Sequence, residues 1–286
     1  MFSLVDASKL TQNMLEKGVI ETMAQTSGVL ERIPFIEVVG SGYSYNIMSD
    51  LPAVEYRQVN TGYNATDVTV DTKVENLVIM GGDADVDVYI AKTYSNINDI
   101  RALQTESKAK SVARQFEKDF FGGLGTNGTL KGLTQRCAEN MAGTEIKGAL
   151  SLDTLNELMD SVVDGADVLY MSKKMRRKVM SLLQASAHYI EMGSDSFGRP
   201  VAMYGGVAII PVDDSLIPAD RIYAVKFGAD QYVAGLSNGG IQVRDLGELD
   251  TLPVFRTRIE MYVGLATKHT KCFAILNTSS TPAASK

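Results

Sequence analysis

Residues 99–123 read DIRALQTESKAKSVARQFEKDFFGG and predict one long amphipathic helix. Lysine, arginine and carboxylate side chains fill most of its surface. Apolar side chains recur near the 3.6-residue helical period at Ile100, Leu103, Val112, Phe116 and Phe120. The sequence therefore predicts a helix with one continuous face to bury.

Both ends of this helix carry local signals. Asn98 or Asp99 can cap its N-terminus, and Gly122-Gly123 ends it. A helix of about 22 residues measures roughly 33 Å, about twice the mean for globular domains. Such a length is unusual for a small compact domain.

The residues before this helix predict two elements that lack a core of their own. Residues 6–31 have helical apolar spacing with a break near Gly18, and this amphipathic arm needs a surface to lie on. Residues 35–80 alternate polar and β-branched residues between turn-like segments, which predicts short strands in a long polar hairpin. Such a hairpin cannot bury enough to be stable alone. Residues 83–94 predict a further strand.

The residues after this helix predict a compact α/β subdomain over 150–247. Two helices begin at the cap residues Ser151 and Ser172, and the first ends at Gly165. Residues 252–277 predict a long two-stranded element. The expected strands of the subdomain are 167–171, 205–212, 221–227, 231–235 and 241–246.

Composition excludes several classes of protein. The chain has 286 residues, 28 Lys and Arg against 34 Asp and Glu, and 45% hydrophobic residues. These values are close to the globular average and unlike those of a disordered chain. A net charge of −6 argues against a wholly basic nucleic-acid binder. Two cysteines, no signal-peptide pattern and no apolar run of about 20 residues predict a soluble cytoplasmic product without a membrane partner.

Motif searches yield no catalytic, cofactor or metal residue. Residues 123–128 match G-x-G-x-x-G, but a helix precedes them where the dinucleotide fingerprint requires a strand. Asp83, Asp85 and Asp87 imitate a calcium loop that lacks its glycine and its final glutamate. His269 and Cys272 supply half of a zinc site. With two histidines in the whole chain, we expect a protein that is not an enzyme and holds no cofactor.

One dense basic cluster stands out against the acidic background. It consists of Lys173, Lys174, Arg176, Arg177 and Lys178. Two interpretations remain open. The cluster can bind a polyanion such as nucleic acid, or it can be a solvated or subunit-contact helix face with Met175 and Val179 turned inward.

An arm and a hairpin without their own core indicate an assembling subunit, and several strings carry a family resemblance. These are RIPFIEVVGSGYSYN, LPAVEYRQVNTGY, LVIMGGDADVDVYIAKT and DIRALQTESKAKSVARQFEKDFFGG. Over residues 1–278 the chain resembles the major capsid protein of tailed double-stranded DNA bacteriophages, with the Hong Kong phage type of capsid fold.

The resemblance implies an α+β architecture. The N-terminal arm is then 1–34 and the extended hairpin loop 35–82. The peripheral domain takes 83–147 and 248–278, with the 98–121 helix as its spine. The axial α/β domain is 148–247, and a flexible tail covers 279–286.

The resemblance also implies a function and partners. The chain is expected to assemble in the host cytoplasm, as hexamers and pentamers, into the icosahedral head of a virion around DNA that it contacts weakly. A portal protein is a further expected partner. About 34 residues precede the hairpin, which implies that scaffolding is a separate protein or absent. Separate scaffolding or decoration proteins are also expected partners. The hairpin contains Lys73, but no crosslinking partner is identified.

The candidate assembly residues come from the hairpin, the long helix and the basic cluster. They are Leu51, Pro52, Tyr56, Arg57, Lys73, Arg114, Lys173, Lys174, Arg176 and Arg177. Two alternatives to a viral shell remain. One is an encapsulin-like bacterial nanocompartment, which shares this fold, and the other is an unrelated α+β enzyme.

Overall fold

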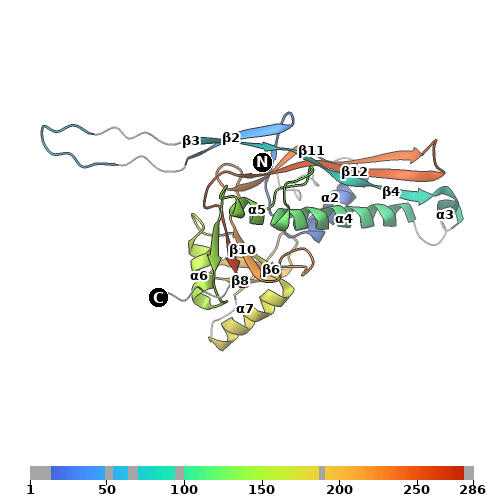
Figure 1. The fold of residues 1–286 in the computed structure, drawn as a ribbon. Helices are drawn as coiled ribbons and strands as arrows, with labels where there is room; N and C mark the ends of the chain where they lie inside the picture. The colour runs from blue at the N-terminus through green and yellow to red at the C-terminus, as the bar shows by residue number, and fades with distance from the viewer. Residues whose placement is uncertain (1–13, 49–53, 64–69, 94–99, 187–190, 280–286) are drawn as a thin grey trace.

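The computed structural model describes residues 14–48, 54–63, 70–93, 100–186 and 191–279 of the chain. Figure 1 shows a mixed α and β architecture, as expected, in which a long horizontal helix lies under one sheet and beside another. That helix is α4 (Ile100–Gly122), which confirms the predicted long helix. Its cap residues Asn98 and Asp99 lie outside the described residues.

The buried face of α4 is aromatic. Phe116, Phe120 and Phe121 are fully buried. The Phe121 ring lies 5.4 Å from that of Tyr170 and 5.0 Å from that of Tyr223. Leu103 was expected on this face, but 58% of its surface is exposed, because the apolar contacts of α4 begin nearer its middle. The C-terminal half of α4 therefore contributes most to the core.

A four-stranded sheet packs over α4. Its order is β1 (Phe35–Glu37), β11 (Val233–Glu248), β12 (Val254–Thr267) and β4 (Val78–Asp87). The prediction of two strands at 231–235 and 241–246 is wrong, because β11 is one strand. Its register against β12 shifts between Ser237 and Ile241, where Gly239 and Gly240 adopt positive φ angles of 71° and 67°. The gap that the sequence suggested between two strands is therefore a β-bulge within one strand, at the two glycines.

A seven-stranded sheet forms the second layer. Its order is β5 (Thr144–Lys147), β13 (Phe273–Asn277), β10 (Arg221–Val225), β6 (Val168–Ser172), β9 (Val207–Val212), β8 (Pro200–Tyr204) and β7 (Glu191–Ser194). The expected two-stranded element over 252–277 is wrong, because β12 and β13 lie in different sheets. The β7–β8 hairpin was not predicted.

Alternation along β6 gives this sheet two buried faces. Val168 and Tyr170 join the apolar cluster that contains α4, whereas Leu169 and Met171 join the cluster under α6 (Leu152–Asp160) and α7 (Lys173–Ala185). Side chains of Ser151 and Ser172 cap α6 and α7, as predicted. Helix α6 ends at Asp160, before the predicted Gly165.

The predicted strand over 83–94 is only half correct. Strand β4 ends at Asp87, and α3 (Val88–Thr93) follows. The Asp87 carboxylate accepts a hydrogen bond of 2.7 Å from the Tyr89 amide, and the Val88 amide donates to Pro253 O. This side-chain cap converts the apolar string VYIAKT from strand to helix.

The described part of the N-terminal arm packs within its own chain. Helix α2 (Met14–Thr26) and the turn after it bury Val19, Met23, Leu30 and Ile33 in the cluster that contains α4. The expectation that the arm needs a neighbouring surface is therefore wrong for these residues. The apolar face of α4 supplies that surface.

A buried carboxylate lies where the arm meets α4. Glu117 accepts hydrogen bonds from the Ser27 hydroxyl and the Gly28 amide, and burial raises its pKa from 4.5 to about 7. Arg114 opposes this rise in pKa, and Asp213 adds to it. The Tyr170 hydroxyl donates to Gly28 O at 3.0 Å. The end of the arm is thus held by polar contacts as well as by packing.

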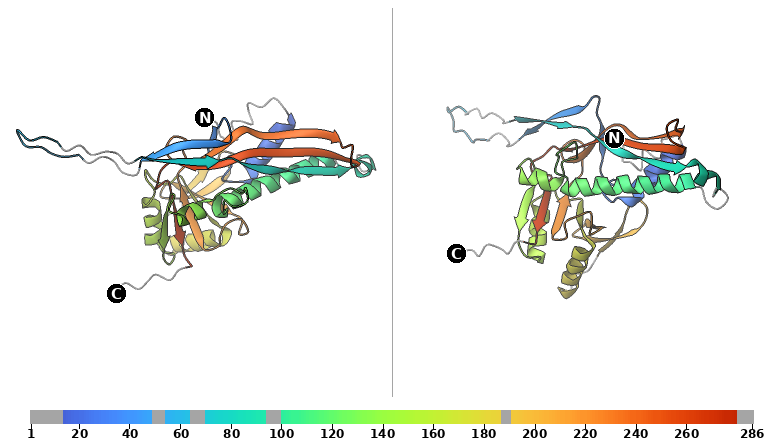
Figure 2. Two further views of the ribbon diagram at one scale, coloured as in Figure 1. Left: turned by 45° about the horizontal axis from the view of Figure 1, so that its top comes forward. Right: turned by 45° about the vertical axis from the view of Figure 1, so that its right-hand side comes forward.

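The predicted hairpin projects from the body (Figure 2). Strands β2 (Gly42–Met48) and β3 (Val70–Asn76) pair antiparallel, from Gly42 opposite Asn76 to Met48 opposite Val70. Only the base of the hairpin joins an apolar cluster, through Tyr45 and Ile47. No helix in the described part of the chain is long and apolar enough to cross a membrane.

Phe116→Ala tests whether α4 is the centre of the core. We expect a loss of about 3–5 kcal/mol in the free energy of unfolding, because a large buried side chain leaves a cavity. Leu103→Ala, on the exposed part of the same helix, is the control and costs under about 1 kcal/mol. Urea unfolding followed by circular dichroism measures both, and equal losses contradict the assignment.

Glu117 predicts a pH dependence of stability. Between pH 4.5 and about 7 the folded chain keeps a proton that the unfolded chain has released, so the free energy of unfolding falls as the pH rises. Glu117→Gln flattens this slope, whereas Glu106→Gln on the exposed face of α4 leaves it unchanged. Urea unfolding at a series of pH values gives the slopes, and identical slopes for all three chains refute the prediction.

Candidate assembly surfaces

The far end of the hairpin exposes apolar side chains that its own chain does not cover. Val54 and Val59 are 90% and 88% exposed, and Tyr56 is fully exposed. Arg57 lies over the Tyr63 ring at 5.5 Å and donates to Thr61 O at 3.4 Å. Of the predicted contact residues here, Tyr56 and Arg57 are therefore accessible. Leu51 and Pro52 lie outside the described residues.

A buried ion pair anchors the base of the hairpin. Arg136 of α5 (Leu133–Ala138) is 1% exposed, and its two terminal nitrogens donate to the Glu75 carboxylate at 2.5 and 2.9 Å. Arg136 also donates to Leu265 O at 2.8 Å and to Lys131 O at 3.0 Å. One guanidinium thus joins β3 of the hairpin to β12 of the four-stranded sheet.

Neighbouring side chains extend this anchor. The Tyr45 hydroxyl donates to Glu75 at 3.4 Å and accepts from the Thr267 amide at 3.3 Å, and burial raises its pKa. Lys73 donates to Met141 O at 2.5 Å. Lys73 was predicted as an assembly residue, and the structure places it in a contact within its own chain.

Two predicted residues from distant segments meet at one carboxylate. Arg114 of α4 and Lys173 of α7 contact Asp213 at 2.7 and 2.6 Å. Hydrogen bonds from Lys173 and Arg114 lower the pKa of Asp213. Because Asp213 holds both cations, they offer less positive charge to a partner than the sequence suggests.

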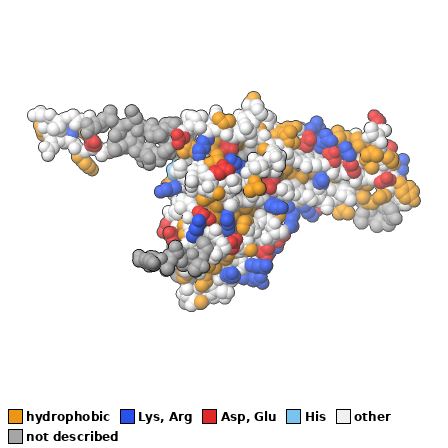
Figure 3. Space-filling model, in the orientation of Figure 1, with side chains coloured by type: hydrophobic (Ala, Val, Ile, Leu, Met, Phe, Trp, Pro, Cys, Tyr) orange, Lys and Arg blue, Asp and Glu red, His pale blue; other side chains and the backbone are white. Residues whose placement is uncertain are grey.

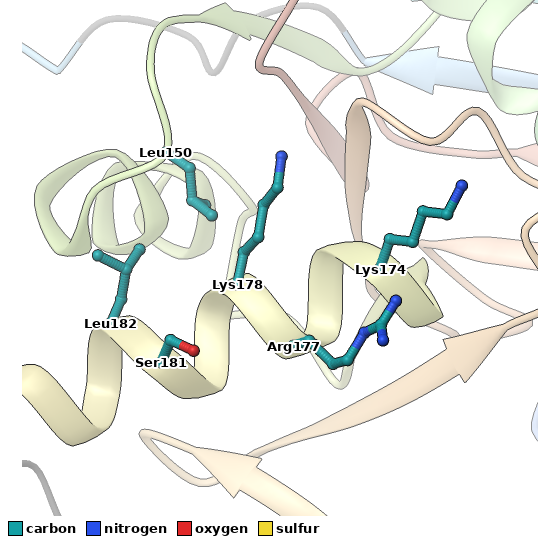
Figure 4. Close-up of a pocket in the computed structure, with 6 residues that line it drawn as sticks. All are labelled: Leu150, Lys174, Arg177, Lys178, Ser181 and Leu182. Carbon is teal, nitrogen blue, oxygen red and sulfur yellow. The ribbon is translucent and has the colours of Figure 1, made fainter.

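The rest of the basic cluster is exposed. Lys174, Arg176, Arg177 and Lys178 project from α7, whereas Met175 and Val179 are buried. Figure 3 shows blue side chains gathered over the lower part of the molecule, where α7 lies. A groove of about 610 Å³ runs between this helix and Leu150 (Figure 4). The predicted inward face is correct, and the cluster is a helix surface.

A second group of charges was missed by the motif search. Asp83 of β4 pairs with Arg258 at 2.7 Å, and Asp85 pairs with Arg256 at 2.6 Å, both from β12. These arginines lower the pKa of both carboxyls. The Asp-x-Asp string that imitates a calcium loop is therefore half of a cross-strand ion-pair ladder. The matching Arg-x-Arg spacing was the available signal.

Exposed apolar side chains also gather at the far end of the four-stranded sheet, where α3 and the β11–β12 turn lie. They are Tyr89, Ile90, Leu246 and Leu252. No sequence pattern marks them, because single apolar residues outside a periodic segment carry no periodic signal. They are common at protein surfaces, so they define no site by themselves.

The other chemical motifs lie in ordinary structural settings. Residues 123–128 form a loop after α4, and an isolated bridge pairs Leu124 with Lys131. Within the described ranges no group of three or more His, Cys, Asp or Glu side chains is placed to hold a metal ion. Cys137 and Cys272 are free thiols.

Comparison with known proteins gives matches of two kinds. A family described as Major capsid protein GP7 matches residues 11–150. The holo-SrpI encapsulin of Synechococcus elongatus PCC 7942 superposes with a TM-score of 0.70, 18% identity and 90% coverage of both chains. No curated protein matches.

Shells from phage and phage-like particles give similar superpositions. The capsid of a native GTA particle has a TM-score of 0.67 at 11% identity, covering 88% of this chain and 90% of that one. Microbacterium phage Oxtober96 gives 0.65 at 16% identity with the same coverage. These superpositions show that the chain has the tailed-phage capsid fold.

The family match adds the particular kind of shell protein. Together with the phage superpositions, it confirms the resemblance to phage major capsid proteins that the sequence indicated. The role of the chain is structural, as a subunit of a shell. Such shells contain many copies of one chain, so copies of the chain itself are its principal partner.

Arg136→Met tests the anchor of the hairpin. It leaves the Glu75 carboxylate buried without its partner, so we expect a loss of about 3–5 kcal/mol in the free energy of unfolding. Arg244→Met is the control, because Arg244 pairs with Glu260 at an exposed site, and it costs under about 1 kcal/mol. Urea unfolding measures both, and a small loss for Arg136→Met contradicts the anchor.

Proposed function

We propose that the chain builds the icosahedral head of a tailed phage around double-stranded DNA. The observation that carries this proposal is the match of residues 11–150 to a major capsid protein family, since fold likeness alone is shared with encapsulins. Hexamers and pentamers of the chain form the shell. The protein then resides in the virion after assembly in the host cytoplasm, and it is not an enzyme.

The two larger sheets support a division of the subunit into an arm, an extended loop, a peripheral domain and an axial domain. Residues 1–34 serve as the arm and 35–82 as the extended loop. The peripheral domain is built on α4 and the four-stranded sheet, and the axial domain on the seven-stranded sheet. Sheet membership supports placing β1, β4 and β11 with the peripheral domain, which makes the extended loop shorter than 35–82. It also supports placing β5 and β13 with the axial domain. This shifts the proposed boundaries of 83–147, 148–247 and 248–278.

The hairpin is the element that couples neighbouring subunits. Its tip exposes Val54, Tyr56 and Val59 at the end of a ribbon whose base is held by the Arg136–Glu75 pair. An isolated two-stranded ribbon is marginal in water, and apolar side chains at its end favour burial. A neighbouring copy supplies that surface, and many repeats of one weak contact close the shell.

The charge of the subunit suits a shell that receives DNA after it has formed. A net charge of −6 keeps the chain from binding DNA over its whole surface, so contacts with packaged DNA are weak. A portal protein and separate scaffolding or decoration proteins complete the set of partners in this proposal.

A nanocompartment shell is the second candidate, favoured by the superposition on the SrpI encapsulin over 90% of both chains. Purified particles distinguish the two functions. A phage head produced with its neighbouring gene products contains nuclease-protected DNA. A nanocompartment contains a protein cargo and no such DNA. Electron microscopy that finds no shell under either condition contradicts both.

Tyr56→Ser tests the hairpin tip. The side chain is fully exposed among the residues that the structure describes, so the free energy of unfolding stays within about 0.5 kcal/mol. Loss of a buried aromatic contact between subunits raises the threshold concentration for assembly at least about tenfold. Tyr89→Ser, at an exposed tyrosine of α3, is the matched control. Light scattering measures assembly, and equal thresholds for all three chains refute the proposed contact.

A further inference from the structure

The basic residues of α7 lower the stability of the helix that contains them. Lys173, Lys174, Arg176, Arg177 and Lys178 all lie in its N-terminal half, and its first turn contains no carboxylate. Cations near a helix N-terminus oppose the helix dipole, and like charges three or four residues apart repel. Only Lys173 has a side-chain ion pair among the described residues, with Asp213. Most of the positive charge on this face is therefore not balanced by nearby carboxylates among the described residues.

The opposite arrangement occurs on α6. Asp153, Glu157 and Asp160 are exposed and spaced along one side of the helix, and its last turn contains no cation. Anions near a helix C-terminus again oppose the dipole. Leu155 and Leu158 occupy the buried side. None of the three carboxylates has an ion pair within the part of the chain that the structure describes.

The two charged faces belong to two helices that cover the same side of the seven-stranded sheet. Helix α6 packs against β13, near one edge of the seven-stranded sheet, and α7 packs against β6 and β9. Figure 1 shows α6 at the left of this sheet and α7 below it. Two different faces of opposite charge on one subunit permit a head-to-tail contact. Such a contact forms a ring when the rotation from copy to copy closes after a full turn, without translation along the axis.

The surface around α7 suits a protein partner. The groove of about 610 Å³ in Figure 4 has Leu150 and Leu182 beside Lys174 and Lys178. A second groove of about 500 Å³ adds Met192, which is largely exposed. A DNA backbone is contacted by cations and polar hydrogen-bond donors, whereas apolar side chains between cations match the surface of another protein.

We propose that the basic face of α7 binds the acidic face of α6 in the next copy of this chain, around the axis of a ring. This inference rests on the proposed shell function and names a contact within it. Opposite charges on the two faces fix the direction of the ring, because α7 against α7 and α6 against α6 repel.

Paired charge reversals test this contact. Arg177→Glu/Lys178→Glu reverses part of the α7 face, and Glu157→Lys/Asp160→Lys reverses part of the α6 face. Each variant alone is expected to associate at least about tenfold more weakly than the wild type. The chain with all four substitutions regains association, because the substituted positions again carry opposite charges. An equimolar mixture of the two variants regains association in rings with an even number of subunits, where the two variants alternate. Sedimentation velocity at low salt measures association, and electron microscopy records rings or shells.

Controls separate this contact from other effects. Lys118→Glu/Lys271→Glu changes the net charge by the same amount as the α7 variant, but at exposed lysines elsewhere. This control is expected to leave association unchanged. Circular dichroism confirms that each variant is folded. Failure of the four-substitution chain and of the mixture to recover overturns the proposal. If the α7 variant instead loses binding to a duplex DNA probe, the basic face binds nucleic acid.

The outcomes also separate this contact from the proposed function. Wild-type shells that package DNA, together with unaffected association of both variants, overturn the contact and leave the function standing. A wild-type chain that never forms shells contradicts the function. The recovery in the mixture is measured on subunits, so it decides the contact in either case.

Discussion

The burial of one aromatic face on α4 organises the subunit. Phe116, Phe120 and Phe121 contact elements of both sheets and of the arm, so the three parts share a single apolar cluster. Removing water from such a face supplies the main favourable free energy, and no single partner covers a helix of this length. The four-stranded sheet, the seven-stranded sheet and α2 each cover part of it. Their relative positions therefore follow from the same contact.

The hairpin is held by a different kind of interaction. Its strands have little apolar surface, so polar contacts at its base determine where it leaves the body. The Arg136 guanidinium joins Glu75 to Leu265 O, and Tyr45 links the same carboxylate to the Thr267 amide. A buried charge pair is costly to break, and it is directional. Rigidity at the base and exposure at the tip suit an element whose partner lies outside the subunit.

Charge is distributed for contact between subunits as well as for stability. Inside the chain, Asp83, Asp85, Arg256 and Arg258 form a ladder across two strands. The cations of α7, and Glu157 and Asp160 of α6, instead oppose the helix dipoles, and apart from Lys173 they have no ion pair among the described residues. Local rules that a sequence breaks without compensation within the fold often mark a functional surface. The net negative charge of the chain disfavours non-specific binding of polyanions such as DNA to these surfaces.

The sequence alone determined the elements whose signals are local. The 3.6-residue period predicts α4, and the hydroxyl caps Ser151 and Ser172 predict the starts of α6 and α7, because both signals act within one or two turns of helix. The polar alternation predicts the β2–β3 hairpin. The family resemblance then predicts the α+β capsid fold, which the structural superpositions confirm.

The tertiary structure decided what depends on residues distant in the sequence. Arg136 and Glu75 are 61 positions apart, and Arg114 and Asp213 are 99 apart, so no local pattern shows that they meet. The same holds for β13, which pairs with β10 and β5 and not with β12. The continuous β11 and the packing of α2 on α4 also required three-dimensional contacts. A chain's local spacing specifies its elements, whereas the choice among partners of similar apolar or charged character is made only when all of them compete for the same surfaces.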